Sequence, residues 1–223
     1  MNIADNLLQL KKSIPGHVVM VTVSKQQPVT ALMEAYQAGQ RIFGENKVQE
    51  LVAKQQKLPS DIEWHFIGHL QTNKVRFLAP CVSLIHSIDR LNLLMEVNKE
   101  ALKHNRIIDC LLQFHIATEE TKFGMDIGEA KEILESKSYR EMKNIRITGV
   151  MGMSSFSDDM ALVRQEFKNL HDFFLILKTS YFKHPDTFNV VSMGMSGDYL
   201  IAIDEGSTMV RIGTAIFGER HYE

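Results

Sequence analysis

The chain has 223 residues, of which 44% are hydrophobic and 23% are charged, an ordinary balance for a globular protein. A formal net charge of −2 provides no basic field for nucleic acid or an anionic membrane surface, although it does not exclude a small anionic ligand. The two cysteines, Cys81 and Cys110, form no CxxC pair, and no segment approaches the ~20 apolar residues of a membrane span. We therefore expect a cytoplasmic protein that binds neither nucleic acid nor membrane.

Short strand-forming runs alternate with longer helical patterns along the chain, at the spacing that is typical of βα units. An opening helix is predicted near residues 2–12. The predicted strands then follow at residues 18–24, 41–44, 64–68, 84–87, 110–116, 145–152, 187–194 and 208–213.

Three of the helical patterns between these strands carry clear signals. The pattern at 28–39 has Pro28 at its start and Gly39 as a stop signal. The pattern at 158–178 begins with acidic residues, which suit a helix N-terminus. The spacing in the pattern at 90–105 predicts one helix face that is formed by Leu91, Leu94, Met95, Asn98 and Leu102.

Eight strands that alternate with helices predict a single domain, residues 1–223, folded as a (β/α)8 TIM barrel with an extra N-terminal helix. A doubly wound open sheet is the alternative. The number of units and the absence of GxGxxG after the first strand favour the barrel. In such a barrel the active face lies at the carboxyl ends of the strands.

Polar residues follow several of the predicted strands at this face. Lys25 comes directly after the first strand, and Asn46 follows the second. Three interpretations of Lys25 are open: a surface lysine, a point charge for a ligand phosphate, or a partly desolvated amine that forms a Schiff base.

The last two strands lead into glycine-containing turns, "MGMSGD" and "GTAIFG", in which Ser196 and Thr214 supply hydroxyl groups and Gly213 allows close approach. Each turn alone is typical of a helix cap, but two at consecutive barrel positions predict a phosphate site. Arg211, inside the last strand, needs a partner. Either a carboxylate such as Asp204 or Glu205, or a ligand's ring nitrogen or carbonyl, would serve.

The segments "VTVSK", "FGEN", "WHFIGHLQTNK", "SMGMSGD" and "GSTMVRIGTAIFG", in this order, resemble the YggS/PROSC family of pyridoxal phosphate homeostasis proteins over nearly the whole chain. The resemblance implies the barrel of alanine racemase without the racemase C-terminal β domain. It also implies pyridoxal 5′-phosphate (PLP) as the cofactor, with no established turnover.

The resemblance further assigns roles to the residues at the strand ends. Lys25 would form the Schiff base, Arg211 would face the pyridine nitrogen, and Asn46 would lie beside the ring. The phosphate would be held by Ser196 and Thr214 and by backbone N–H groups near Met195 and Gly213. No catalytic or metal-binding residue is implied. His69 stands where many family members have proline, so it receives no role.

The expected function is that of a monomer that holds PLP, buffers it and delivers it to apoenzymes. An arginine partner disfavours a protonated pyridine, and no tyrosine is clearly placed as a base, so we expect no enzyme activity. Lys122 is either a second amine for handover or a loop lysine paired with Glu119 or Glu120.

Four other functions remain as alternatives. A minimal racemase or transaminase would use the same cofactor. A class I aldolase would use the lysine and the phosphate turns. Such aldolases usually carry their lysine on a later strand, so the position of Lys25 after the first strand disfavours this function. A metal-dependent hydrolase would need His65, His69, His86 and His115, which form no HxH or HExxH motif. A pure interaction protein would bind PLP as an ancillary ligand.

Overall fold

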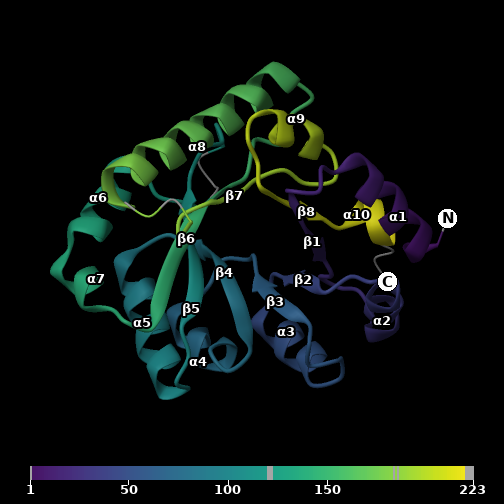
Figure 1. The fold of residues 1–223 in the computed structure, drawn as a ribbon, viewed down its shortest axis with the longest axis horizontal. Helices are drawn as coiled ribbons and strands as arrows, with labels where there is room; N and C mark the ends of the chain where they lie inside the picture. The colour runs from purple at the N-terminus through teal and green to yellow at the C-terminus, as the bar shows by residue number, and fades with distance from the viewer. Residues whose placement is uncertain (1, 120–122, 183, 185, 219–223) are drawn as a thin grey trace.

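The computed structural model describes residues 2–119, 123–182, 184 and 186–218. Its parallel strands close into a barrel in sequence order, with the last strand paired to the first (Figure 1). The strands are β1 (Val19–Val23), β2 (Ile42–Glu45), β3 (Glu63–Phe66), β4 (Val82–Ile88), β5 (Ile108–Phe114), β6 (Ile145–Gly152), β7 (Val190–Ser192) and β8 (Met209–Ile212). The closed ring confirms the barrel prediction and excludes the open sheet.

Helices surround the strands, as Figure 1 shows. They are α1 (Ile3–Ser13), α2 (Val29–Gln37), α3 (Val48–Gln55), α4 (Val75–Leu78) after the 3-10 helix η1 (Thr72–Lys74), α5 (Leu91–Lys103), α6 (Ile127–Glu135), α7 (Lys137–Glu141), α8 (Met160–Tyr181), α9 (Tyr199–Asp204) and α10 (Thr214–Phe217). Helix α1 precedes β1 and is the extra helix that the sequence predicts. It lies beside α10, where the Asn6 side-chain amide donates to the Ile216 carbonyl over 2.9 Å (Figure 1).

The helix ends follow the signals in the sequence. Asp159 caps α8, because its carboxylate accepts from the backbone N–H groups of Ala161 and Leu162. Pro28 caps α2, and Gly39 follows that helix with a φ of +88°, a conformation that favours glycine. Local chemistry therefore sets these boundaries.

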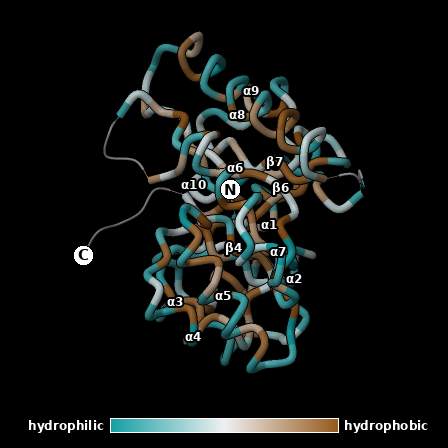
Figure 2. Tube along the Cα trace, turned by 90° about the vertical axis from the view of Figure 1, so that its left-hand side faces the viewer, coloured by the Kyte–Doolittle hydropathy of each residue, from teal (hydrophilic) through white to brown (hydrophobic). Residues whose placement is uncertain are grey.

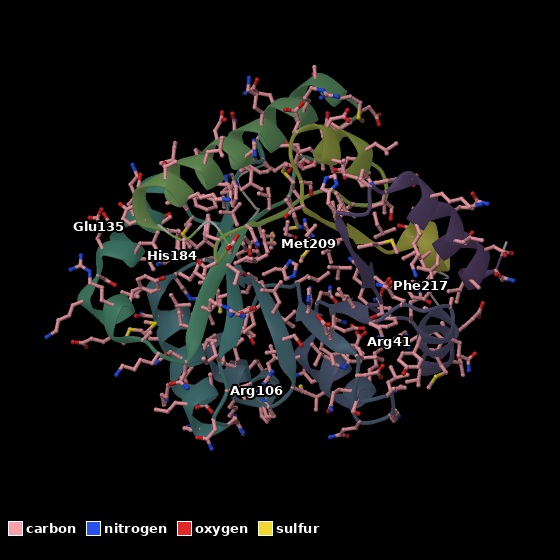
Figure 3. All side chains as sticks on the ribbon, in the orientation of Figure 1. Arg41, Arg106, Glu135, His184, Met209 and Phe217 are labelled. Carbon is pink, nitrogen blue, oxygen red and sulfur yellow. The ribbon has the colours of Figure 1, made fainter. Side chains whose placement is uncertain are left out.

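The apolar core has two parts. The larger part lies between the strands and the helices, and the alternating brown and teal along the helices in Figure 2 reflects their one-sided burial. The smaller part comes from strands alone and lies inside the ring, with Met209 near the centre of the view in Figure 3. It consists of Val21, Leu84, Leu111, Met151 and Met209. The barrel is therefore filled with side chains rather than open as a channel.

Two predicted elements differ from the structure. The strand predicted at 187–194 is reduced to Val190–Ser192. At its carboxyl end the chain turns at Gly194, where φ is +94° and a Cβ atom would lie 2.6 Å from Ala202 Cβ. The predicted face of α5 is wrong: Met95 and Leu102 are exposed. The apolar side chains that α5 buries are Leu93, Leu94, Val97 and Ala101. Among the described residues, no helix combines the length and the apolar character needed to cross a bilayer.

Candidate functional site

Lys25 lies just past the carboxyl end of β1, and the backbone on both sides of it is held in place. The Ser24 hydroxyl donates to Glu45 Oε1 over 2.6 Å, and the buried Lys54 ammonium donates to the Ser24 carbonyl over 2.8 Å. On the other side, the Gln26 N–H donates to Glu50 Oε2 over 2.9 Å. Gln26 has a φ of +62°, which is uncommon for a side-chain-bearing residue. The half-buried Lys25 therefore projects from a restrained turn.

The residues that hold this turn form a buried charge cluster, which the sequence analysis missed. Lys54 Nζ lies 2.7 Å from Glu45 Oε1 and 3.3 Å from Glu50 Oε2. Burial raises the pKa of Glu45, although the Lys54 ammonium opposes this. Burial would also raise the pKa of Glu50, but the Gln26 N–H and Lys54 outweigh it and lower that pKa. The spacing of Glu50 and Lys54, four residues apart on α3, was the one sequence signal that indicated an ion pair here.

Asn46 follows β2 at the same end of the barrel and is half-buried. Its Oδ1 atom is buried and accepts no hydrogen bond from the described residues, and the same is true of Glu45 Oε2. The loop after β3 packs closely against Asn46, since a Cβ atom at Gly68 would lie 2.3 Å from the Asn46 carbonyl oxygen. An unpaired buried acceptor is costly, so Asn46 Oδ1 is ready to receive a donor.

The two glycine-containing turns after β7 and β8 come together, as the sequence predicts. The backbone N–H groups of Gly213 and Ala215 each lie 3.3 Å from Ser196 Oγ, and Thr214 Oγ1 lies 3.5 Å from it. A single oxygen thus occupies the point where donors of the second turn converge. The Met195 N–H instead donates to Asp198 Oδ1 over 2.5 Å. The arrangement is suited to an anion's oxygen atoms.

Arg211 is buried in β8, and its partners differ from the carboxylates that the sequence analysis considered. Its Nη1 donates to the carbonyl and the hydroxyl of Ser192 over 2.8 and 2.7 Å, and its Nη2 donates to the Gly152 carbonyl over 2.9 Å. Burial lowers the pKa of Arg211 to about 10, although the charge of Asp198 opposes this shift.

Of the two kinds of partner that the sequence left open for Arg211, the carboxylates Asp204 and Glu205 are therefore wrong. Asp204 and Glu205 belong to the outer surface, where both pair with Arg164 of α8. Asp204 ends α9 and Glu205 is its C-cap residue, and both carboxylates face α8.

The histidines form no metal site among the residues that the structure describes. His65 Nδ1 and His86 Nε2 lie 3.1 Å apart inside the barrel, so His86, isolated in the sequence, has a partner on the neighbouring strand. His69 pairs with Asp89 at 3.5 Å and stacks on Phe123. His115 contacts the Glu119 carbonyl. Lys122, considered for handover, lies outside the described residues.

The comparisons with known proteins agree with this architecture. A family model described as "Alanine racemase, N-terminal domain" matches residues 1–221. The solved structure of an alanine racemase from Clostridium difficile 630 superposes with a TM-score of 0.81 at 13% identity, covering 100% of this chain and 61% of the racemase chain. At that identity the likeness concerns the fold alone.

Closer relatives share one description. The "Pyridoxal phosphate homeostasis protein" of Aquifex aeolicus (strain VF5) is 41% identical over 208 residues, which cover 91% of this chain and 87% of the relative. That of Escherichia coli (strain K12) is 37% identical over 235 residues, covering 99% and 98%. The structure of PipY from Synechococcus elongatus with PLP bound has a TM-score of 0.87 at 33% identity, covering 97% of this chain and all of PipY. The chain therefore belongs to the family of pyridoxal phosphate homeostasis proteins, which share the N-terminal barrel of alanine racemase.

Proposed function

We propose that this protein binds PLP at the carboxyl ends of its strands, with Lys25 as the covalent attachment point. The observation that carries the proposal is the convergence of donors from the turns after β7 and β8 on Ser196 Oγ, at the same end of the barrel as Lys25. Barrels often bind phosphate with these two loops. The PLP-bound structure of PipY supports the same cofactor here.

The residues present fit the cofactor. Ser196, Thr214 and the backbone of Gly213 offer hydroxyl and N–H donors to a phosphate. Asn46 offers a buried oxygen without a partner to a polar ring substituent. Rotation of the Asp198 carboxylate would release the Met195 N–H for the same phosphate.

When bound, PLP supplies an aldehyde that condenses with a lysine amine with loss of water, and a pyridine ring that withdraws electrons. Ser24 and Gln26 keep Lys25 in place for this chemistry through their bonds to Glu45 and Glu50. Arg211 presents a fixed positive charge, which disfavours protonation of a nearby pyridine nitrogen. Its three bonds go to Ser192 and Gly152, and its Nε–H and one Nη2–H have no acceptor among the residues that the structure describes.

We further propose that the protein holds and delivers PLP as a monomeric carrier, with apoenzymes as recipients and without turnover of its own. Residues 1–223 would act as one cofactor-binding unit. The tyrosine hydroxyls of the described residues support the absence of turnover, because several of them already bind other side chains. Tyr36 binds Asp61, Tyr181 binds Glu135, and Tyr199 contacts Ser13. A minimal racemase would instead need a hydroxyl free to exchange protons with substrate.

The decisive measurement is the absorption spectrum of the protein with PLP, before and after borohydride reduction. Lys25→Ala should abolish the reducible covalent adduct, whereas the control Lys57→Ala, at an exposed lysine, should keep it. Ser196→Ala should weaken PLP binding about 10-fold or more, since it removes a hydrogen bond to a charged group. Ser180→Ala on the outer surface of α8 is the matched control. An undiminished adduct in Lys25→Ala contradicts the attachment point.

Turnover and delivery need their own assay. Transfer of stoichiometric PLP from the protein to an apoenzyme should outpace capture of free PLP at the same concentration. Steady racemisation or transamination by the purified protein, lost in Lys25→Ala, would establish an enzyme instead of a carrier.

A further inference from the structure

A chain of hydrogen bonds crosses the inside of the barrel from Arg211 to His65. Arg211 Nη1 lies 2.7 Å from Ser192 Oγ, and Ser192 Oγ lies 3.0 Å from His86 Nδ1. His86 Nε2 lies 3.1 Å from His65 Nδ1. The four side chains come from β8, β7, β4 and β3, and each is at most 4% exposed. Water therefore does not compete for these bonds.

Arg211 sets the direction of every bond in this chain. A guanidinium can only donate, so Ser192 Oγ accepts from it. The Ser192 hydroxyl hydrogen then has one acceptor among the described residues, His86 Nδ1. His86 consequently carries its proton on Nε2 and donates to His65 Nδ1. His65 in turn carries its proton on Nε2.

Both histidines are neutral in this arrangement, because each has one ring nitrogen that accepts. Burial lowers the pKa of His65 to about 3. Burial, together with the nearby His65 and Arg211, holds the pKa of His86 well below its ordinary value. Burial and hydrogen-bond direction therefore agree on the protonation of the chain.

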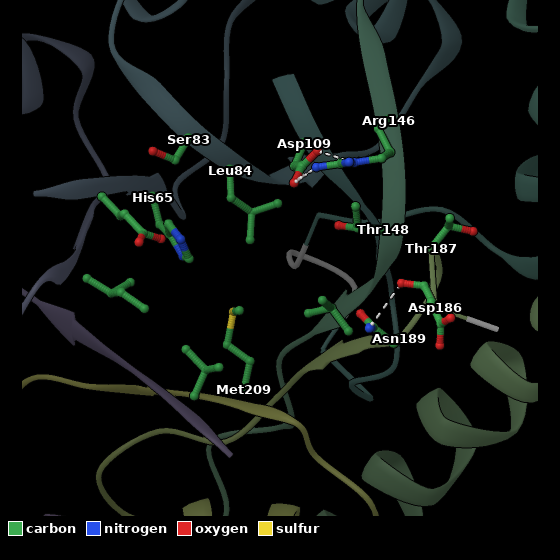
Figure 4. A pocket seen from close by; sticks show the side chains of 14 residues that line it. His65, Ser83, Leu84, Asp109, Arg146, Thr148, Asp186, Thr187, Asn189 and Met209 are labelled. Carbon is green, nitrogen blue, oxygen red and sulfur yellow. Dashed lines mark hydrogen bonds and ion pairs between the residues drawn. The ribbon is translucent and has the colours of Figure 1, made fainter. Parts of the chain in front are cut away.

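The far end of the chain opens on a cavity of about 370 Å³ at the amino-terminal mouth of the barrel, opposite the candidate PLP site (Figure 4). His65 lines this cavity, together with Leu84, Val190 and Met209. Those three apolar residues stand two positions before His86, Ser192 and Arg211, so the chain lies one layer further into the barrel. His65 Nε2 has no hydrogen-bond partner among the described residues, and its N–H is available to the cavity.

We propose that Ser192, His86 and His65 are positioning residues that orient the Arg211 guanidinium toward the cofactor and couple it to the amino-terminal mouth. The inference rests on the proposed function for the cofactor end. Loss of His86 would leave the Ser192 hydroxyl hydrogen without an acceptor, so that this hydroxyl no longer has one fixed orientation toward Arg211. Loss of His65 would leave the His86 N–H without its acceptor and disturb Arg211 less.

The direction of the chain can be tested without cofactor. Nitrogen-15 NMR of the histidine rings at pH 7 should show both His65 and His86 as neutral tautomers with the proton on Nε2. A proton on His86 Nδ1, or a doubly protonated His86, would overturn the proposed direction. This measurement does not depend on whether the protein binds PLP.

The coupling is tested with His86→Phe, His65→Phe and the rescue variant His86→Gln, whose amide retains a donor and an acceptor. Met151→Leu, which alters the barrel interior outside the chain, is the control. In the cofactor-free protein, exchange with water of the Arg211 Nη1–H protons, which bind Ser192, should accelerate at least about 10-fold in His86→Phe, less in His65→Phe, and not in the control. His86→Gln should restore slow exchange.

With PLP added, His86→Phe should shift the absorption maximum of the bound cofactor while the Lys25 adduct persists. Equal Arg211 exchange in His86→Phe and Met151→Leu would overturn the positioning role. If wild-type protein forms no adduct at Lys25, the proposed function fails. The exchange and tautomer measurements then still show whether Ser192, His86 and His65 orient Arg211.

Discussion

Lys54 illustrates how single residues at the rim restrain Lys25. Its ammonium has three acceptors: the Ser24 carbonyl, Glu45 Oε1 and Glu50 Oε2. Dehydrating an ammonium and a carboxylate is expensive, and their mutual attraction offsets that cost only when the geometry is good. The cluster therefore contributes mainly by fixing the Ser24–Lys25 peptide, and either charge left alone would be strongly destabilising.

We expect Lys54→Met to lower the free energy of unfolding by about 3–5 kcal/mol, because it leaves Glu45 buried and unpaired. Adduct formation at Lys25 should slow as well, since the preceding carbonyl loses its ammonium partner. Urea unfolding and the rate of the absorption change with PLP measure the two effects. Lys57→Met, at an exposed lysine three residues on, should change stability by less than about 0.5 kcal/mol. Equal stability of the two variants would contradict the stabilising role of the Lys54 ion pair.

At the scale of elements, α5 shows how the barrel selects one face of a helix. The apolar side chains of this segment cover more than half of the helix circumference, so periodicity alone allows more than one buried face. Packing against the neighbouring strands buries Leu94 completely and leaves Leu102 59% exposed. The predicted face held both residues, and tertiary packing separates them.

These two leucines provide a matched pair. Leu94→Ala should lower the free energy of unfolding by about 2–5 kcal/mol, because it removes buried methyl groups and leaves a cavity. Leu102→Ala, on the same helix, should change it by less than about 0.5 kcal/mol. Denaturant midpoints of the two variants compare the faces directly. Similar losses at both positions would mean that α5 is rotated about its axis.

At the scale of the whole molecule, the barrel has two differently built ends. The carboxyl end carries Lys25 and the turns with Ser196 and Gly213, where donors and charges meet. The interior and the opposite mouth carry neutral histidines in a chain of hydrogen bonds. Burying these histidines makes the stability of the entire fold depend on pH.

His65 keeps a folded-state pKa of about 3, whereas an unfolded histidine titrates near 6.5. Below about pH 6.5 His65 therefore binds a proton in the unfolded chain but not in the folded protein. The free energy of unfolding consequently falls as the pH decreases. For His65 the loss should reach about 2 kcal/mol at pH 5. Well above pH 6.5, where the unfolded histidine is also neutral, this contribution no longer changes.

Urea unfolding at pH 7 and pH 5 measures this loss for the wild type, His65→Gln and His104→Gln. The loss on acidification should be about 2 kcal/mol smaller in His65→Gln than in the wild type. His104→Gln, at an exposed histidine after α5, should retain the wild-type dependence. An unchanged loss in His65→Gln would show that His65 takes up its proton in the folded state.

The positions of the strands could be predicted because alternation of short apolar runs with helical patterns is a local property. Predicted strands at 18–24 and 208–213 match β1 and β8 closely. The two turns with Ser196 and Thr214 could also be predicted as neighbours, since consecutive strands of a barrel lie side by side. The partners of Arg211 could not, because Gly152 is 59 residues away in the chain.

By itself, the sequence determined the order of the strands, the acidic start of α8 and which residues stand at the carboxyl ends of the strands. These depend on local chemistry and on the period of side-chain burial. Only the tertiary structure decided that the Lys54 ammonium binds the Ser24 carbonyl before Lys25. The same holds for the hydrogen bonds that link Arg211 through Ser192 and His86 to His65 across the barrel. Barrel closure and strand stagger set those contacts, and neither leaves a periodic trace in the chain.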